Sequence, residues 1–528
     1  MARILLTNAN IVTGASSKKG ALAIDGERIA GIWYRGGSDL DDSAAVQAFP
    51  DSEIIDLDGK VLMAGGIDAH VHFREPGMEW KADIESESKA ALLGGVTSFI
   101  DMPNTKPPTT DLETLQDKLN RASERSWANY GFHIGATNDN AAMIREYLAE
   151  GHGAEFGGIK VFMGSSTGNM LVDDNEALSD LFRIQGKPIL IHSEDEGIIK
   201  ANLEAAKAKF GEDIPFSEHP RIRSRKACIR STAKALAMAI EYGTRLHVLH
   251  VSTAEEVEMI RAAKIHNPNI TAETSANYLW FCDEDYEKLK GKVKCNPAIK
   301  SASDREALRK GLAEGIIDTI GSDHAPHLLS EKVDNYLKCP SGMPSVQQSL
   351  SALLTAAALY NEGKNADDDA LISLSRIASA FSERPAEILG IKDRGHLKVG
   401  NYADLVILDP EQEYSVKSHA DLVRNVPEQE YSVKNVAYKC GWSPYEGTTL
   451  RGVIDRVFLN GKQVIADSRL LPTPVSLSVG YTQANTDEMV LSFTLLSMET
   501  VRFLQKDSAK TLSSNMSVSG HRSKTMLS

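Results

Sequence analysis

Residues 61–73, VLMAGGIDAHVHF, form an almost continuous apolar run that ends in His70 and His72. Strands that are buried on both faces of a parallel sheet have this near-continuous apolar pattern. Longer amphipathic stretches separate this run from seven more, so we expect eight strand and helix units. Eight units predict an α/β fold, a closed (β/α)8 TIM-like barrel over residues 61–392, rather than a doubly wound open sheet. The seven later runs begin at Val96, Asn129, Gly157, Pro188, Arg245, Asn269 and Ile317.

Both ends of the chain carry shorter strand patterns. In residues 1–60 and 393–472, apolar runs are punctuated by Gly, Asp and Asn, which is typical of hairpins. The pair Asn460–Gly461 is the sequence of a type I′ turn. Because these patterns flank the barrel on both sides, we expect one small β-sandwich domain that is formed by both termini.

Two segments do not follow this plan. Residues 403–417, ADLVILDPEQEYSVK, recur as ADLVRNVPEQEYSVK at residues 420–434. This spacing is shorter than the roughly 20–50 residues of repeat folds, so it indicates a local tandem duplication in which one copy pairs and the other loops out. Residues 473–528 are rich in Ser and Thr and lack a sustained pattern, so we expect a disordered or loosely attached tail.

The composition excludes several classes of protein. The chain has 42% hydrophobic and 25% charged residues, an ordinary globular mixture. A net charge of −14 without a basic run argues against nucleic acid or an anionic membrane as a partner. No stretch reaches the roughly 18 apolar residues of a membrane helix. Five scattered cysteines and the absence of a signal peptide predict a cytoplasmic protein. A small anionic substrate would need a local cation.

Polar residues stand at the C-terminal ends of the predicted barrel strands. His70 and His72 alternate on one strand and therefore point the same way, and imidazole suits Zn²⁺. An isolated pair of this kind is usually not a metal site. However, four other runs end at or near Lys160, His192, His250 and Asp323, and TIM barrels carry their active sites at this end. Packing alone does not explain such convergence, although a protonated lysine cannot ligate a cation.

These residues lie in segments that resemble the amidohydrolase superfamily, and within its cyclic amidase branch the dihydroorotases. The similarity spans roughly residues 4–472. It implies two Zn²⁺ ions in the barrel, one held by His70, His72 and Asp323. The other is held by His192 and His250, and Lys160, carboxylated by CO₂, bridges both ions. The matching segments are GGIDAHVHFREPG, MPNTKPP, GIKVFMG, IHSED, HVSTAEEVEMI and GSDHAPH.

The same resemblance implies the substrate contacts. Arg74 follows His72 by two residues, and its guanidinium fork suits a carboxylate. Asn104 and His327 resemble further carboxylate contacts of dihydroorotases. Asn296 matches a substrate-contacting position, and Gly342 is expected to present backbone groups to the ring.

Dihydroorotases interconvert (S)-dihydroorotate and N-carbamoyl-L-aspartate in pyrimidine biosynthesis. The resemblance implies that a hydroxide activated by the two zinc ions attacks the ring amide. Asp323 is the implied catalytic residue, acting as general base and then as general acid. The resemblance also implies a homodimer.

Two alternatives stay open. A hydantoinase, dihydropyrimidinase or allantoinase would share the metal site without needing Arg74. A non-catalytic scaffold of the same fold would have lost ligands, whereas all six positions are present here. The segment TAETSANYL differs from the commoner Thr-Pro-His form of relatives and is assigned no role. The remaining histidines are interpreted as surface or core residues: His133, His152, His219, His247, His266, His324, His396, His419 and His521.

Overall fold

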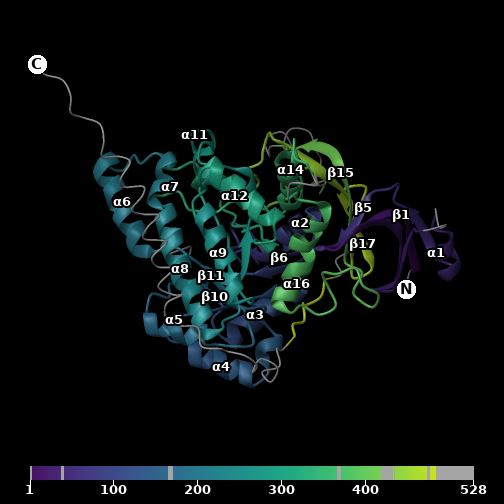
Figure 1. The fold of residues 1–528 in the computed structure, drawn as a ribbon, viewed down its shortest axis with the longest axis horizontal. Helices are drawn as coiled ribbons and strands as arrows, with labels where there is room; N and C mark the ends of the chain where they lie inside the picture. The colour runs from purple at the N-terminus through teal and green to yellow at the C-terminus, as the bar shows by residue number, and fades with distance from the viewer. Residues whose placement is uncertain are drawn as a thin grey trace, which may run out of the picture.

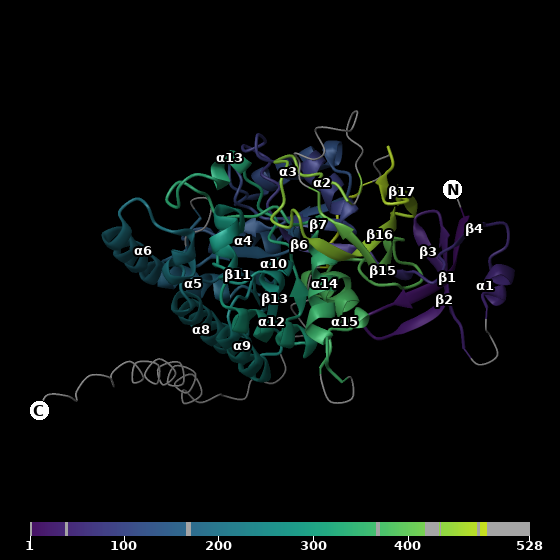
Figure 2. The same ribbon diagram turned by 90° about the horizontal axis from the view of Figure 1, so that it is seen from above.

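The computed structural model describes most of the chain, and two bodies of secondary structure make up the fold. A barrel surrounded by helices lies beside a sheet that is built from both ends of the chain (Figures 1 and 2). Among the described residues, no helix has the length and apolarity that a membrane span requires. The described residues are 3–36, 41–164, 170–365, 370–417, 432, 434–472 and 476–482.

Eight parallel strands form the barrel, and each of them corresponds to one predicted run. Pairing runs from β6 to β8 in one sheet and from β9 to β14 in another, and β8 and β9 follow each other along one strand. The ring closes where the His72 amide donates to the His324 carbonyl over 2.8 Å. The predicted TIM-like barrel is therefore confirmed. Its strands are β6 (Gly66–Val71), β7 (Val96–Asp101), β8 (Asn129–Phe132) with β9 (Ile134–Gly135), β10 (Ile159–Phe162), β11 (Ile189–His192), β12 (Leu246–Val248), β13 (Thr271–Thr274) and β14 (Thr319–Ile320).

Helices follow the barrel strands and pack around the ring (Figure 1). Several begin at a side chain that satisfies the free amides of the first turn. Asp111, Thr253 and Ser301 form capping boxes at the starts of α3, α9 and α12. The main helices are α2 (Ile84–Leu93), α3 (Leu112–Arg125), α4 (Ala141–Ala149), α5 (Asn175–Phe182), α6 (Glu196–Phe210), α8 (Arg225–Tyr242), α9 (Ala254–His266), α12 (Ala302–Ala313), α14 (Ser349–Asn361) and α16 (Arg384–Leu389).

The two chain ends share one β-rich domain, as predicted, although its strands pair in one continuous sheet and not in the two separate sheets of a sandwich. Its strands pair in a single nine-stranded sheet in the order β18-β17-β16-β15-β5-β1-β2-β3, with β4 beside β1. Asn460 and Gly461 have φ values of 49° and 76°, the left-handed pair that a type I′ turn requires. The strands are β1 (Arg3–Val12), β2 (Ser17–Asp25), β3 (Arg28–Tyr34), β4 (Glu53–Asp56), β5 (Val61–Ala64), β15 (Leu405–Ser415), β16 (Thr449–Leu459), β17 (Lys462–Ala466) and β18 (Arg469–Leu470).

The first apolar run is divided between the two bodies. Residues 61–64, predicted as barrel, form β5, which pairs with β1 and β15 of the terminal sheet. The barrel begins only at Gly66. Gly65 lies between β5 and β6, where an added Cβ would stand 2.2 Å from Thr97 Oγ1. A run of thirteen residues exceeds the usual strand of roughly five or six, which is why it supplies two strands.

Residues 476–482 differ from the loose tail that the sequence predicted. The Tyr130 amide donates to the Leu477 carbonyl over 3.1 Å, and the Val479 amide donates back to Tyr130 over 2.8 Å. This segment therefore lies parallel to β8 and pairs with it at Tyr130. Val479 and Tyr481 are buried in an apolar cluster with Ile67 and Leu190 near the starts of β6 and β11. We refer to this cluster, which has Ile67, Leu190, Val479 and Tyr481 at its centre, as the barrel floor.

The first copy of the tandem repeat supplies β15, which pairs with β5 and β16. The second copy lies outside the described residues apart from Ser432 and Lys434. The expectation that it loops out therefore stays a prediction, as does the tail over residues 483–528.

Candidate active site

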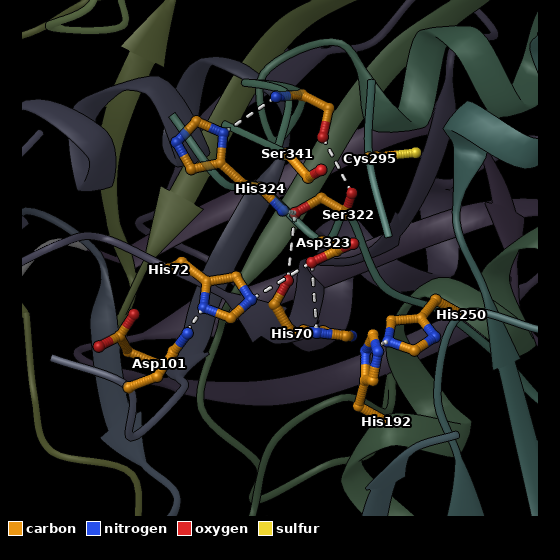
Figure 3. Close-up of polar contacts among 12 residues, drawn as sticks. His70, His72, Asp101, His192, His250, Cys295, Ser322, Asp323, His324 and Ser341 are labelled. Carbon is orange, nitrogen blue, oxygen red and sulfur yellow. Dashed lines mark hydrogen bonds and ion pairs between the residues drawn. The ribbon is translucent and has the colours of Figure 1, made fainter. Parts of the chain in front are cut away.

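Three predicted ligands meet at the C-terminal ends of barrel strands β6 and β14. His70 lies in β6, His72 follows that strand by one residue, and Asp323 follows β14 by three. Their nitrogen and oxygen atoms all lie within 4.8 Å of one another. His70 Nε2 and His72 Nε2 are 3.4 and 3.3 Å from Asp323 Oδ1 (Figure 3). Two ligand atoms at 2.0–2.1 Å from a tetrahedral zinc ion lie about 3.3–3.5 Å apart, so the spacing of His70, His72 and Asp323 fits this ion.

A second pair of imidazoles faces the first. His192 ends β11 and His250 follows β12 by two residues. His192 Nδ1 and His250 Nε2 are 2.9 Å apart, and the rings of His250 and His70 have centroids 5.4 Å apart (Figure 3). Burial lowers the pKa of His72 to about 4 and that of His250 well below its usual range. These rings are therefore neutral at pH 7, the form that binds metal ions.

Lys160 lies in β10 and is 1% exposed. Its Nζ is 4.6 Å from the centroid of the Phe162 ring. Burial lowers the pKa of Lys160 to about 7, although Asp323 and Glu273 act in the opposite direction. The structure thus places a buried amine close to the His and Asp groups, whereas the amine of an ordinary lysine extends into solvent.

Three of the site residues have left-handed backbone conformations. The φ values are 68° for Arg74, 39° for His250 and 48° for Asp323. This conformation is uncommon outside glycine, asparagine and aspartate, and it persists only where the surrounding fold imposes it. The strand ends therefore hold these side chains at a cost in backbone energy.

Glu273 is a site residue that the sequence analysis missed. It lies in β13, within the segment that was assigned no role, and its Oε1 is 2.7 Å from His70 Nδ1. Burial acts to raise the pKa of Glu273, but His70 and His247 outweigh it and lower the pKa to about 2. A buried carboxylate that holds the second nitrogen of a histidine orients the first nitrogen toward a metal ion.

Glu194 holds His192 in the same manner, and it was also missed. Its Oε2 is 3.0 Å from His192 Nε2, and Arg223 donates a hydrogen bond to the same oxygen. Burial acts to raise the pKa of Glu194, but Arg223 and His192 lower it to about 2. The only signal in the sequence was the alternation of residues 192 and 194 in IHSED, which puts both side chains on one face of the strand.

A cavity opens beside Asp323, and four of the five predicted substrate residues line it. Arg74 is 2% exposed and its Nε donates to the Pro326 carbonyl over 3.1 Å. Asn104 also lies 2.8 Å from His72 Nδ1 through its Oδ1, so it contacts both the cavity and a predicted ligand. Asn296 Oδ1 is buried and has no hydrogen-bond partner among the described residues. The lining residues are His72, Arg74, Asn104, Asn296, Asp323, Ala325, Ser341 and Gly342.

Gly342 lines the cavity, but its backbone groups already have partners, and His327 does not line the cavity. The Gly342 amide already donates to the Lys294 carbonyl over 2.9 Å, and its own carbonyl accepts from Lys332 Nζ over 2.8 Å. Its φ of 139° instead explains the need for glycine. His327 is not among the residues that line the cavity. It lies behind Arg74, with its Nε2 3.1 Å from Arg74 Nη2.

The buried histidines outside this group have structural partners. His324 Nε2 is 2.8 Å from Glu87 Oε2, and His247 Nδ1 is 2.8 Å from Thr271 Oγ1. His133 Nε2 is 2.9 Å from the Ala69 carbonyl, and His219 Nδ1 is 2.8 Å from the Tyr336 hydroxyl. These contacts agree with the interpretation of the four residues as core histidines.

Comparison with known proteins gives the family. Residues 61–464 match the family model described as "Amidohydrolase family". The chain belongs to the amidohydrolase family. Among amidohydrolase relatives, it is 34% identical over 405 residues to a dihydroorotase of Methanosarcina acetivorans. This alignment covers 75% of this chain and 79% of the relative. It is 28% identical over 469 residues to an allantoinase of Streptomyces avermitilis, covering 88% and 96% of the two chains. In structure it is similar to an L-hydantoinase from Arthrobacter aurescens, with a TM-score of 0.78, 26% identity and coverage of 91% and 100%.

Proposed function

We propose that this protein is a dihydroorotase, an amidohydrolase that interconverts (S)-dihydroorotate and N-carbamoyl-L-aspartate. The observation that carries the proposal is the buried Arg74 guanidinium in the cavity wall beside Asp323. A buried cation is costly unless an anion neutralises it. A cyclic amide that carries a carboxylate supplies that anion, whereas hydantoin and allantoin do not. The dihydroorotase relatives favour the same substrate.

We infer that His70, His72 and Asp323 hold one zinc ion and that His192 and His250 hold a second. Lys160 would supply a ligand to both ions after its neutral amine adds to CO₂: a nitrogen–carbon bond forms, the amine loses a proton to solvent, and a carbamate anion results. Bound there, two zinc ions would polarise the amide carbonyl and lower the pKa of a water molecule. Glu273 and Glu194 orient His70 and His192 for this role.

Asp323 is the residue that moves protons. Burial acts to raise its pKa, but His70, His72 and Lys160 outweigh that effect and lower it, so Asp323 is a carboxylate at neutral pH. In hydrolysis it accepts a proton from the attacking water and delivers it to the ring nitrogen as the carbon–nitrogen bond breaks. In the direction of synthesis Asp323 takes the proton from the carbamoyl nitrogen as the nitrogen–carbon bond forms. The side-chain carboxyl group of the substrate, which has gained one proton from solvent, receives this second proton from Asp323 and loses one oxygen as water.

Three other residues of the cavity wall orient the substrate. Arg74 pairs with the ring carboxylate through its planar fork, and Asn104 and Asn296 add hydrogen bonds from the neighbouring walls. Fixing the carboxylate sets the distance between Asp323 and the reacting amide.

Turnover of four cyclic amides tests the proposal. We expect activity on dihydroorotate and little on hydantoin, dihydrouracil or allantoin, with about two zinc ions per chain in the same sample. Activity on hydantoin or allantoin without activity on dihydroorotate would instead identify the other cyclic amidases. No turnover together with less than about one zinc ion per chain would favour a scaffold.

The variant Arg74→Met gives the matched test of substrate choice. Loss of the bidentate pair should lower kcat/KM for dihydroorotate by about 100-fold or more. Zinc content should stay unchanged because Arg74 does not contact the His and Asp group. Unimpaired turnover of dihydroorotate by this variant would contradict the assignment.

A further inference from the structure

Lys81 lies behind the cavity wall, in the loop between β6 and α2, and it contacts His327. Lys81 is 9% exposed, and its Nζ is 2.9 Å from His327 Nδ1 and 2.8 Å from Glu331 Oε1. On the other side of the ring, His327 Nε2 is 3.1 Å from both Arg74 Nη2 and the Ser341 carbonyl oxygen. The ring is thus held between three polar groups, and their chemistry decides which nitrogen carries the proton.

The contact with Lys81 determines the tautomer of His327. An ammonium group has donors and no acceptor, so at 2.9 Å His327 Nδ1 must be the acceptor and carry no proton. The proton is therefore on Nε2, where it donates to the Ser341 carbonyl. In this state Arg74 Nη2 and the ring Nε2–H are two donors 3.1 Å apart and make no hydrogen bond, and the two hydrogen bonds of the ring with Lys81 and Ser341 outweigh this one opposition.

The other protonation states fit less well. A proton on Nδ1 would oppose the Lys81 ammonium, and the Nε2 lone pair would oppose the Ser341 carbonyl oxygen. Glu331 Oε2 is 3.9 Å from Nδ1, too far to accept such a proton. A doubly protonated ring would stand against Lys81 and Arg74. Burial and the nearby charges of Arg74, Lys332 and Lys81 lower the pKa of His327 well below its usual range, which agrees with a neutral ring.

We propose that Lys81 is a positioning residue that fixes His327 as the Nε2–H tautomer and so keeps the Arg74 donors available for the substrate carboxylate. If the proton moved to Nδ1, Nε2 would accept a hydrogen bond from Arg74 Nη2 and compete with the substrate. Glu331 holds Lys81 in place for this role. The consequence for binding rests on the proposed function, whereas the tautomer itself does not.

Nitrogen NMR of ¹⁵N-histidine-labelled protein tests the tautomer without any substrate. The variant His327→Gln assigns the His327 signals by their disappearance. We expect the wild-type ring to show a protonated Nε2 and an unprotonated Nδ1. We expect Lys81→Met to move the ring toward the Nδ1–H form, while Lys81→Arg, which also offers only donors, retains the wild-type pattern. An Nδ1–H ring in the wild-type protein would overturn the proposal even if Lys81→Met failed to fold.

Binding of matched ligands tests the consequence. Orotate and uracil are similar rings with and without a carboxylate. Lys81→Met should raise the KM for dihydroorotate and the inhibition constant of orotate by about 10-fold, the worth of one charged hydrogen bond, and change that of uracil by less than about 2-fold. The value of kcat should change little.

The control is Lys106→Met, which removes an exposed lysine from the loop after β7 and should leave all three constants unchanged. Equal effects of the two variants, or an unchanged orotate constant in Lys81→Met, would refute the role of Lys81. If dihydroorotate is not turned over but the tautomer is as expected, the proposed function fails and the assignment of Lys81 stands.

Discussion

The two ends of the barrel are built from opposite materials. At the C-terminal end, buried polar groups contact one another: Glu273 holds His70, Glu194 holds His192, and Lys81 holds His327. At the floor, apolar side chains fill the ring, and the C-terminal segment 476–482 completes it. The end that carries the chemistry is polar and has strained backbone, whereas the other end supplies packing. In TIM barrels generally, reactivity and stability divide between the two ends in this way.

This division means that substitutions at one end should change activity and those at the other should change stability. The strongest expected effect is that of Asp323→Asn. An amide cannot accept the proton, so kcat for dihydroorotate should fall by about 1,000-fold or more. The melting temperature should stay within a few degrees of wild type. A kcat within 10-fold of wild type would show that another group moves the proton.

At the floor, Tyr481→Ala should have the converse effect. Removing a buried aromatic ring leaves a cavity and should lower the free energy of unfolding by about 3 kcal/mol, measured by denaturant titration. The value of kcat should be unchanged at temperatures where the variant is folded. Tyr34→Ala, at a tyrosine that is 44% exposed, is the control and should cost less than about 0.5 kcal/mol. A loss of kcat in Tyr481→Ala would show that the two ends are coupled.

A smaller effect is expected for Glu273→Gln, which keeps the shape of the side chain and removes the charge that holds His70. Zinc affinity, measured by competition with a chelator, should fall by about 10- to 100-fold. Glu256→Gln is the control, since Glu256 is also buried but caps α9 without contacting a predicted ligand. It should lower stability and leave zinc affinity unchanged. Equal zinc affinity in Glu273→Gln and the wild type would contradict the role of Glu273.

The smallest effect concerns Lys187, just before β11 at the floor. Its Nζ lies 4.7 Å from the centroid of the Tyr481 ring, and it has no hydrogen-bond partner among the described residues. Burial, with Arg245 and Lys392 nearby, lowers the pKa of Lys187 to about 7. From that pH up to about 10.4 the unfolded chain binds the extra proton, so this group makes stability rise with pH. Lys187→Met should therefore raise the melting temperature more at pH 6 than at pH 10. Equal gains at both pH values would contradict this pKa.

The sequence was informative about the end that carries the chemistry because six unusual residues stand at or near the ends of five of the eight apolar runs. It did not reveal Glu273, because the contact of this residue with His70 exists only once the closed barrel brings β6 near β13. The signal for Glu194, its alternation with His192 in IHSED, is too weak by itself to identify a partner of the histidine. It was misleading about residues 476–482. Their sequence, SLSVGYT, alternates apolar and polar residues, but over only seven positions in a stretch rich in Ser and Thr. Val479 and Tyr481 are buried because this segment pairs with Tyr130 in β8.

The contribution of distant segments to the floor and the terminal sheet has a consequence for biosynthesis. Strand β5 pairs with β15, more than 300 residues later in the chain, and β8 pairs with residues beyond 476. A ribosome must therefore deliver the chain as far as Leu408 before the first ladder can close, and as far as Val479 before the second can. Until then the nascent chain presents unpaired strand edges, so the protein needs protection from aggregation late in translation.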